Sequence, residues 1–126
     1  MSYIQIEIGG KLRGLKFNQY ASIKFYKHVD LKDYDASSIY AMVYAGLAAN
    51  SYVKREEFVD KDGDKETPIT FEMVCDWVDK LTDEVVIAVA GAFTESESFK
   101  KIIKESEKIA DQELTKKNLT ISSEKI

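Results

Sequence analysis

The chain has 126 residues, of which 44% are hydrophobic and 32% charged, enough for one domain with a single core. Its 18 basic and 22 acidic residues give a net charge of −4, and no segment gathers Lys and Arg into a phosphate-binding stripe, which argues against nucleic-acid binding. Cys75 is the only cysteine, so an internal disulfide is excluded and a reducing, cytoplasmic location is expected.

Neither a signal peptide nor a membrane span is expected. The first seven residues contain no basic segment followed by an apolar run. The longest uncharged stretch, residues 36–53, is interrupted by Ser, Gly and Asn and falls short of the ~20 apolar residues of a membrane span. We interpret this stretch as a buried or interface helix.

The chain opens with a predicted β-hairpin. Isoleucines occupy every second position from 4 to 8, the pattern of a half-buried strand. Gly9-Gly10 then supplies the positive φ angles of a tight turn. The second strand contains Gly14 as a candidate bulge. Its apolar residues are Leu12, Leu15 and Phe17.

After Asn18 the chain is predicted to be mainly helical, because apolar residues recur at helical spacing. Residues 54–67 are charged, contain Asp62-Gly63-Asp64 and are expected to form a surface loop. In residues 85–93 the β-branched side chains favour a strand and the alanines a helix; we interpret the segment as a helix. The candidate N-caps are Asn18, Ser37 or Ser38, Thr70, Thr82, and Thr94 in a capping box with Glu97.

The predicted fold is therefore α+β and mostly α-helical, with an N-terminal β-hairpin followed by about five helices. Residues 1–95 are expected to form a single globular domain. Residues 96–126 are expected to form a charged amphipathic C-terminal helix and a frayed tail, because a narrow apolar stripe runs along a heavily charged segment.

No catalytic residues are predicted. His28 lacks a neighbouring nucleophile, and Cys75 stands in an acidic and apolar setting that does not favour a thiolate. Asp76 and Asp79 share one helix face, but solvated helix charges explain them better than acid–base chemistry.

Cofactors and metals are not expected either. Residues 60–66 alternate carboxylates as an EF-hand loop does, but with Asp60 as position 1 the sixth position is Lys65 and the twelfth is Phe71. A solvated turn explains this segment better. No Gly-rich phosphate loop occurs, and Gly9-Gly10 alone indicates a turn.

Two apolar surfaces are candidate partner-binding sites, each with an alternative role in packing. The first is the helix bearing Tyr40 and Tyr44, which core packing within the chain would also explain. The second is the stripe of the C-terminal helix, which either docks on its own domain or binds a partner. The candidate residues in this stripe are Phe99, Ile102, Ile103 and Ile109.

The order of motifs resembles the tail assembly chaperones of long-tailed siphophages and related prophages. The succession begins with the Ile-rich strand, Gly9-Gly10-Lys11 and Leu15-Lys16-Phe17-Asn18, and continues with the uncharged segment 39–47. Thr70-Phe71-Glu72-Met73-Val74, Asp76-Trp77-Val78-Asp79 and a hydrophobic helix reaching Ala92-Phe93 complete it, so that the resemblance covers about residues 2–95.

This resemblance implies a non-enzymatic protein of the bacterial host cytoplasm. Such chaperones bind the tape measure protein, keep it soluble until tail-tube protein polymerises around it, and are absent from the virion. Self-association is expected, because a long client needs apolar surface in repeated copies. The alternative is another phage structural or connector protein, or a small bacterial adaptor without catalysis.

Overall fold

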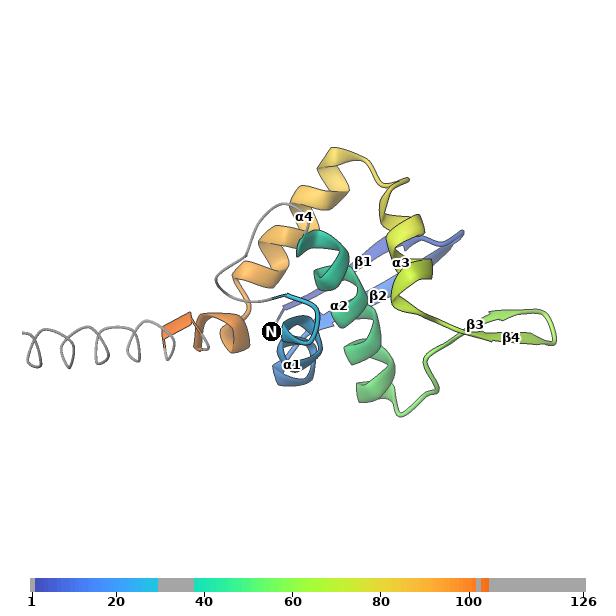
Figure 1. Cartoon of the computed structure of the whole chain (residues 1–126), viewed down its shortest axis with the longest axis horizontal. Helices are drawn as coiled ribbons and strands as arrows, with labels where there is room; N and C mark the ends of the chain where they lie inside the picture. The colour runs from blue at the N-terminus through green and yellow to red at the C-terminus, as the bar shows by residue number, and fades with distance from the viewer. Residues whose placement is uncertain (1, 30–37, 102, 105–126) are drawn as a thin grey trace, which may run out of the picture.

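The computed structural model describes residues 2–29, 38–101 and 103–104 (Figure 1). In this part of the chain the fold is α+β and mostly helical, with an N-terminal β-hairpin followed by five helices, which confirms the predicted fold class. The elements are β1 (Ser2–Ile8), β2 (Lys11–Phe17), α1 (Gln19–Tyr26), α2 (Ile39–Lys54), β3 (Val59–Asp62), β4 (Lys65–Pro68), α3 (Phe71–Val78), α4 (Asp83–Thr94) and a helix that begins at residue 97.

The N-terminal hairpin is regular from end to end. β1 and β2 pair antiparallel without interruption, from Ser2 opposite Phe17 to Ile8 opposite Lys11. The turn consists of Gly9 and Gly10, whose φ angles of 61° and 77° are those for which glycine is favoured.

The predicted bulge at Gly14 is wrong, because Gly14 stands in register opposite Gln5. A close approach explains this glycine instead. A Cβ atom at position 14 would lie 2.5 Å from the hydroxyl oxygen of Tyr3 and 3.0 Å from the side-chain nitrogen of Asn50.

The helices cover one face of the hairpin (Figure 1). α2 packs across β2, α4 lies against β1, and α1 and α3 pack on α2. The covered face carries Ile6, Ile8, Leu15 and Phe17, all nearly inaccessible to solvent. The opposite face is open, as an antiparallel sheet permits, and on it Leu12 remains 63% exposed.

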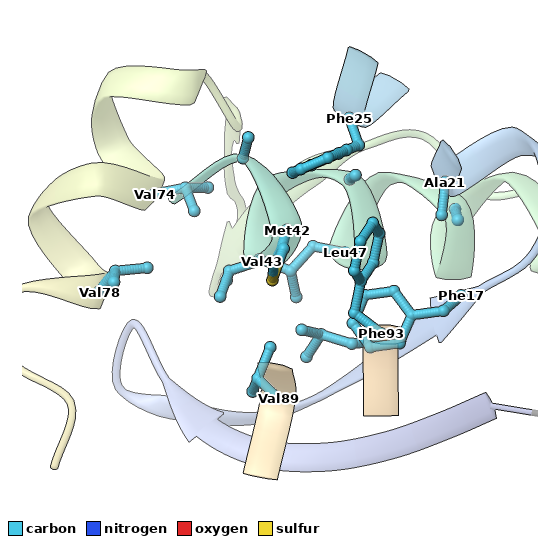
Figure 2. Close-up of a cluster of buried hydrophobic side chains, with 14 of the residues drawn as sticks. Phe17, Ala21, Phe25, Met42, Val43, Leu47, Val74, Val78, Val89 and Phe93 are labelled. Carbon is cyan, nitrogen blue, oxygen red and sulfur yellow. The ribbon is translucent and has the colours of Figure 1, made fainter. Parts of the chain in front are cut away.

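Helix α2 is the centre of the fold and half of its residues are buried, which agrees with the interpretation of this stretch as a buried or interface helix. Phe25 of α1, Phe17 of β2 and Phe93 of α4 surround it (Figure 2). The Phe93 ring makes an edge-on contact with Phe17 at 5.4 Å and lies 4.7 Å from the Phe25 ring. No helix in the described ranges is long and apolar enough to cross a membrane.

Three of the predicted N-caps are confirmed. The side-chain oxygen of Asn18 accepts a hydrogen bond from the Ala21 amide at 3.0 Å, and the Thr70 and Thr82 hydroxyls do the same for the amides three residues on. The segment after Thr82 is α4, so residues 85–93 are helical as predicted. Ser38 precedes α2 with helical φ and ψ of −63° and −15°, rather than the extended angles of a side-chain cap; Ser37 lies outside the described residues.

The capping box predicted at Thr94 is wrong, because α4 continues through this residue. The Thr94 hydroxyl donates to the Ala90 carbonyl at 3.0 Å. Ser96 is the residue that caps the next helix: its hydroxyl accepts from the Phe99 amide at 3.2 Å and donates to the Phe93 carbonyl at 2.7 Å. One buried hydroxyl thus joins the end of α4 to the start of the following helix.

The surface loop predicted over residues 54–67 contains a second hairpin. β3 and β4 pair antiparallel from Val59 opposite Pro68 to Asp62 opposite Lys65, around Gly63 at φ 63°. The Asp-Gly turn was recognised in the sequence, but the strands were missed. Most of their residues are polar and exposed, so that the alternation that marks a half-buried strand is absent.

Candidate functional site

Tyr44, predicted as a partner-binding residue, lies in an aromatic cluster between α1, α2 and α3. Its ring centroid is 5.4 Å from His28, 5.6 Å from Phe58 and 5.5 Å from Phe71. The His28 imidazole also stacks on Phe71, with 4.3 Å between the centroids and 6° between the planes. Tyr44 is therefore half-buried within its own chain, and the exposed His28 side chain contacts the same aromatic cluster.

Tyr40, one helical turn before Tyr44, is half-buried and joins two helices. Its hydroxyl donates a hydrogen bond to Oδ1 of Asp79 at 2.7 Å, which ties the start of α2 to the end of α3. This hydrogen bond, with the negative charge of Asp79, raises the pKa of the Tyr40 phenol. Asp79 thus has a structural contact, and both Asp76 and Asp79 are exposed helix carboxylates.

Cys75 has the properties of an unreactive thiol. It is half-buried on α3, and burial, followed by the charges of Asp79, Asp76 and Glu72, raises its pKa. A protonated thiol is a poor nucleophile. Among the described residues no group of three or more His, Cys, Asp or Glu side chains is placed to hold a metal ion.

Asp60, the first residue of the rejected EF-hand pattern, connects the two hairpins. Its Oδ1 lies 2.8 Å from Nη2 of Arg13 and 3.2 Å from Nζ of Lys11. The hydrogen bond from Arg13 is the main cause of a lowered Asp60 pKa, and Lys11 adds to it.

Arg13 also fixes the turn of the N-terminal hairpin. Its guanidinium donates to the Ile8 carbonyl at 2.8 Å and to the Gly9 carbonyl at 3.1 Å. It lies 4.6 Å from the ring centroid of Trp77, a cation–π distance. The same indole covers Gly9 so closely that a Cβ there would be 2.7 Å from the ring. Sequence analysis assigned no role to Arg13.

The start of the predicted C-terminal stripe packs on its own domain. Phe99 is 9% exposed, and its ring lies 4.6 Å from that of Phe93. Ile103 packs against the same core and is partly buried. The core therefore extends beyond the boundary expected at residue 95. The side chain of Ile102 and the whole of Ile109 lie outside the described residues.

Large apolar side chains remain exposed on several elements. Tyr52 stacks on Tyr20: the two ring centroids are 4.2 Å apart with planes 4° apart, and Nζ of Lys24 lies 5.6 Å from the Tyr20 centroid. Tyr52 is 60% exposed, so this pair offers a flat aromatic surface next to a cation. The exposed large apolar residues are Tyr3, Leu12, Ile23, Tyr52, Val53 and Ile87.

Comparisons of the chain with protein-family models, with curated proteins and with solved structures found no match.

Proposed function

We propose that this chain is a non-enzymatic protein-binding domain. The groups that could carry chemistry are engaged in structure: His28 in aromatic stacking, Asp79 in a hydrogen bond to Tyr40, and Asp60 in ion pairs. The Tyr20–Tyr52 pair meanwhile presents apolar surface to solvent beside the Lys24 ammonium. Exposed apolar surface rimmed by charge is typical of sites that bind other polypeptides.

Within this class, we propose that the domain is a tail assembly chaperone. It binds the tape measure protein, keeps it soluble, assists the recruitment of tail-tube subunits, and is not retained in the virion. The observation that carries the proposal is the ordered succession of motifs over residues 2–95, because motifs that are distant in the sequence meet in the fold.

Three such contacts connect the motifs. The indole of Trp77 covers Gly9 of the glycine pair. Phe17, at the end of the second strand, lies against both Gly46 of the uncharged helix and Phe93 of the last hydrophobic helix. A set of motifs that shares one core is better suited to define a family than a set of independent short matches.

The client-binding surface is proposed to include the Tyr20–Tyr52 pair. Tyr40 and Tyr44 of the sequence-based proposal make contacts within the chain, so that replacing them would disturb folding as well as binding. Partner binding by the stripe of the C-terminal helix stays a proposal; its residues are Phe99, Ile102, Ile103 and Ile109. Phe99 already packs on Phe93, so the client would have to compete with this contact within the chain.

A solubility assay tests the function directly. If the adjacent long open reading frame encodes a tape measure protein, as the proposal expects, a fragment of it is diluted from denaturant, and its aggregation is followed by light scattering with and without equimolar chain. We expect the wild-type chain to suppress scattering, and Tyr52→Ser to suppress it less. Ile87→Ser is the matched control, because it also removes an exposed apolar side chain but from a different helix.

Unchanged aggregation in the presence of folded wild-type chain would refute the proposal. Equal loss with Tyr52→Ser and Ile87→Ser would refute the Tyr20–Tyr52 pair as the client-binding site. Gene order distinguishes the alternative of a connector or adaptor: a chaperone gene lies between the tail-tube gene and a very long helical open reading frame.

A further inference from the structure

The two edges of the N-terminal hairpin differ in protection. Side chains from other elements contact β2. Asp60 of the second hairpin forms ion pairs with Lys11 and Arg13, and the Asn50 side chain lies close to Gly14. α2 packs on β2, and β2 runs nearer to α2 than β1 does (Figure 2). Among the described residues β1 pairs with β2 alone, and its second edge has no neighbouring strand.

The sequence of β1 lacks the usual protection of an edge strand. Proteins block such edges within the strand by lysine, proline, bulges or a very short length, or cover them with a helix or loop. Ser2–Ile8 has seven residues, an uninterrupted register and no lysine or proline, and Glu7 is its single charge. It is therefore a strand of high β propensity whose outward main-chain groups pair with no other strand in the described part of the chain.

The turn identifies the residues whose main-chain groups point outward. In a two-residue hairpin the flanking pair, here Ile8 and Lys11, exchanges both hydrogen bonds, and bonded and non-bonded pairs then alternate. The N–H and C=O groups of Tyr3, Gln5 and Glu7 therefore point away from β2. Their side chains stand on the open face of the sheet, where all three are exposed.

We propose that β1 pairs antiparallel with β1 of a second copy about a twofold axis at Gln5, forming a four-stranded sheet. This register sets the outward groups of Tyr3 against those of Glu7 and those of Gln5 against themselves, so the whole length of the edge is paired. It also sets Glu7 opposite Tyr3, which avoids the like-charge contact that a register centred on Glu7 would create.

The inner face of the strand supports the same occupant. In this register Ile4 of one copy stands opposite Ile6 of the other. Ile6 and Ile8 are buried, whereas Ile4 at the open end is half-buried. A second copy would cover Ile4 with its own isoleucine, and the core beneath the hairpin would continue across the axis. An isologous contact of this kind closes at two copies.

The inference does not rest on the proposed chaperone function, because it follows from the edge of the hairpin alone. It adds to that function a stated mode of self-association. The test uses the purified full chain without any client, so its outcome is independent of tape measure binding.

The first test is sedimentation velocity over a concentration series with Gln5→Pro and Gln5→Thr. Proline removes only an outward N–H and is tolerated on a strand edge, whereas threonine keeps the donor. We expect Gln5→Thr to dimerise as the wild type does, and Gln5→Pro to associate at least about tenfold more weakly, because each half of the symmetric ladder loses a bond. Circular dichroism confirms that both variants are folded.

The second test is cross-linking in a Cys75→Ser background. Gln5→Cys should form an intermolecular disulfide under mild oxidation, because residue 5 faces its own copy across the axis. Leu12→Cys, which is also exposed on the same face of the hairpin but lies on β2, should not. A wild-type chain that stays monomeric at high concentration, a dimer insensitive to Gln5→Pro, or equal cross-linking at both positions would overturn the proposal.

Discussion

Two glycines within helices predict opposite responses to the same substitution. Gly46 of α2 lies where the helix crosses β2: a Cβ there would be 2.8 Å from Cε1 of Phe17 and 2.9 Å from Cβ of Leu15. Because the Leu15 Cβ is fixed to the strand backbone, a rotamer change cannot relieve this contact. At Gly91 of α4, no atom of the described residues lies within 4 Å of the corresponding position, apart from the neighbouring residues and the backbone of the helix itself.

The expected free energies follow from two terms. Replacing a helical glycine by alanine stabilises a helix by about 0.5–1 kcal/mol, and overpacking a close contact costs about 1–3 kcal/mol. Gly91→Ala gains only the first term. Gly46→Ala has the same helix gain but also the overpacking cost, which is larger. We therefore expect a net decrease of about 1–2 kcal/mol in its free energy of unfolding.

Urea denaturation followed by circular dichroism measures both variants against wild type. The two should differ by about 1.5–3 kcal/mol, which corresponds to melting temperatures roughly 10 °C apart for a domain of this size. Stabilisation by both substitutions would show that α2 does not lie so close to β2. Destabilisation by Gly91→Ala would show instead that the outer face of α4 is covered.

Three further substitutions test the core, the caps and the ion pairs. Phe93→Ala empties the site between the Phe17, Phe25 and Phe99 rings and should lower the free energy of unfolding by about 3–5 kcal/mol in urea titrations. Ser96→Ala should cost about 1–2 kcal/mol and more than Thr94→Ala by thermal denaturation, since Ser96 is the cap. Asp60 has a lowered folded pKa, so its stabilisation is complete above the ordinary carboxyl pKa of about 4 and is lost as the pH falls through the folded value; Asp60→Asn should flatten stability against pH in this acid range.

The elements with strong local patterns were predictable. Alternating isoleucines and Gly9-Gly10 gave the first hairpin its boundaries, and Thr70 and Thr82 stand where helices begin. Helix α4 was resolved correctly in spite of its β-branched residues, because its alanines and the acidic first turn agree with a helix.

The remaining features depend on contacts that are distant in the sequence. The second hairpin has polar strands, and Asp60 joins it to Arg13 by an ion pair that no local pattern reveals. Gly14 and Gly46 are glycines because side chains from other elements approach them. Thr94 and Ser96 both belong to residue types that cap helices. Because Phe99 packs beside Phe93, the last helix begins after Ser96, whose hydroxyl accepts from the Phe99 amide.

The candidate site was only partly predictable for the same reason. Tyr40 and Tyr44 were selected for apolar character on a helix, but the spacing of a stripe does not state whether a partner or another element covers it. The Tyr20–Tyr52 pair unites residues from α1 and α2, so it emerges only when the two helices are packed.

The contact between Trp77 and Gly9 gives the molecule a natural optical reporter. Trp77 is the only tryptophan in the chain, and it lies against the N-terminal turn under the Arg13 guanidinium. During synthesis on the ribosome the first hairpin emerges before α3. The turn at Gly9 and Gly10 is therefore not covered by Trp77 until α3 has been synthesised. The emission of this single fluorophore therefore records the moment at which the earliest and a late segment of the chain come together.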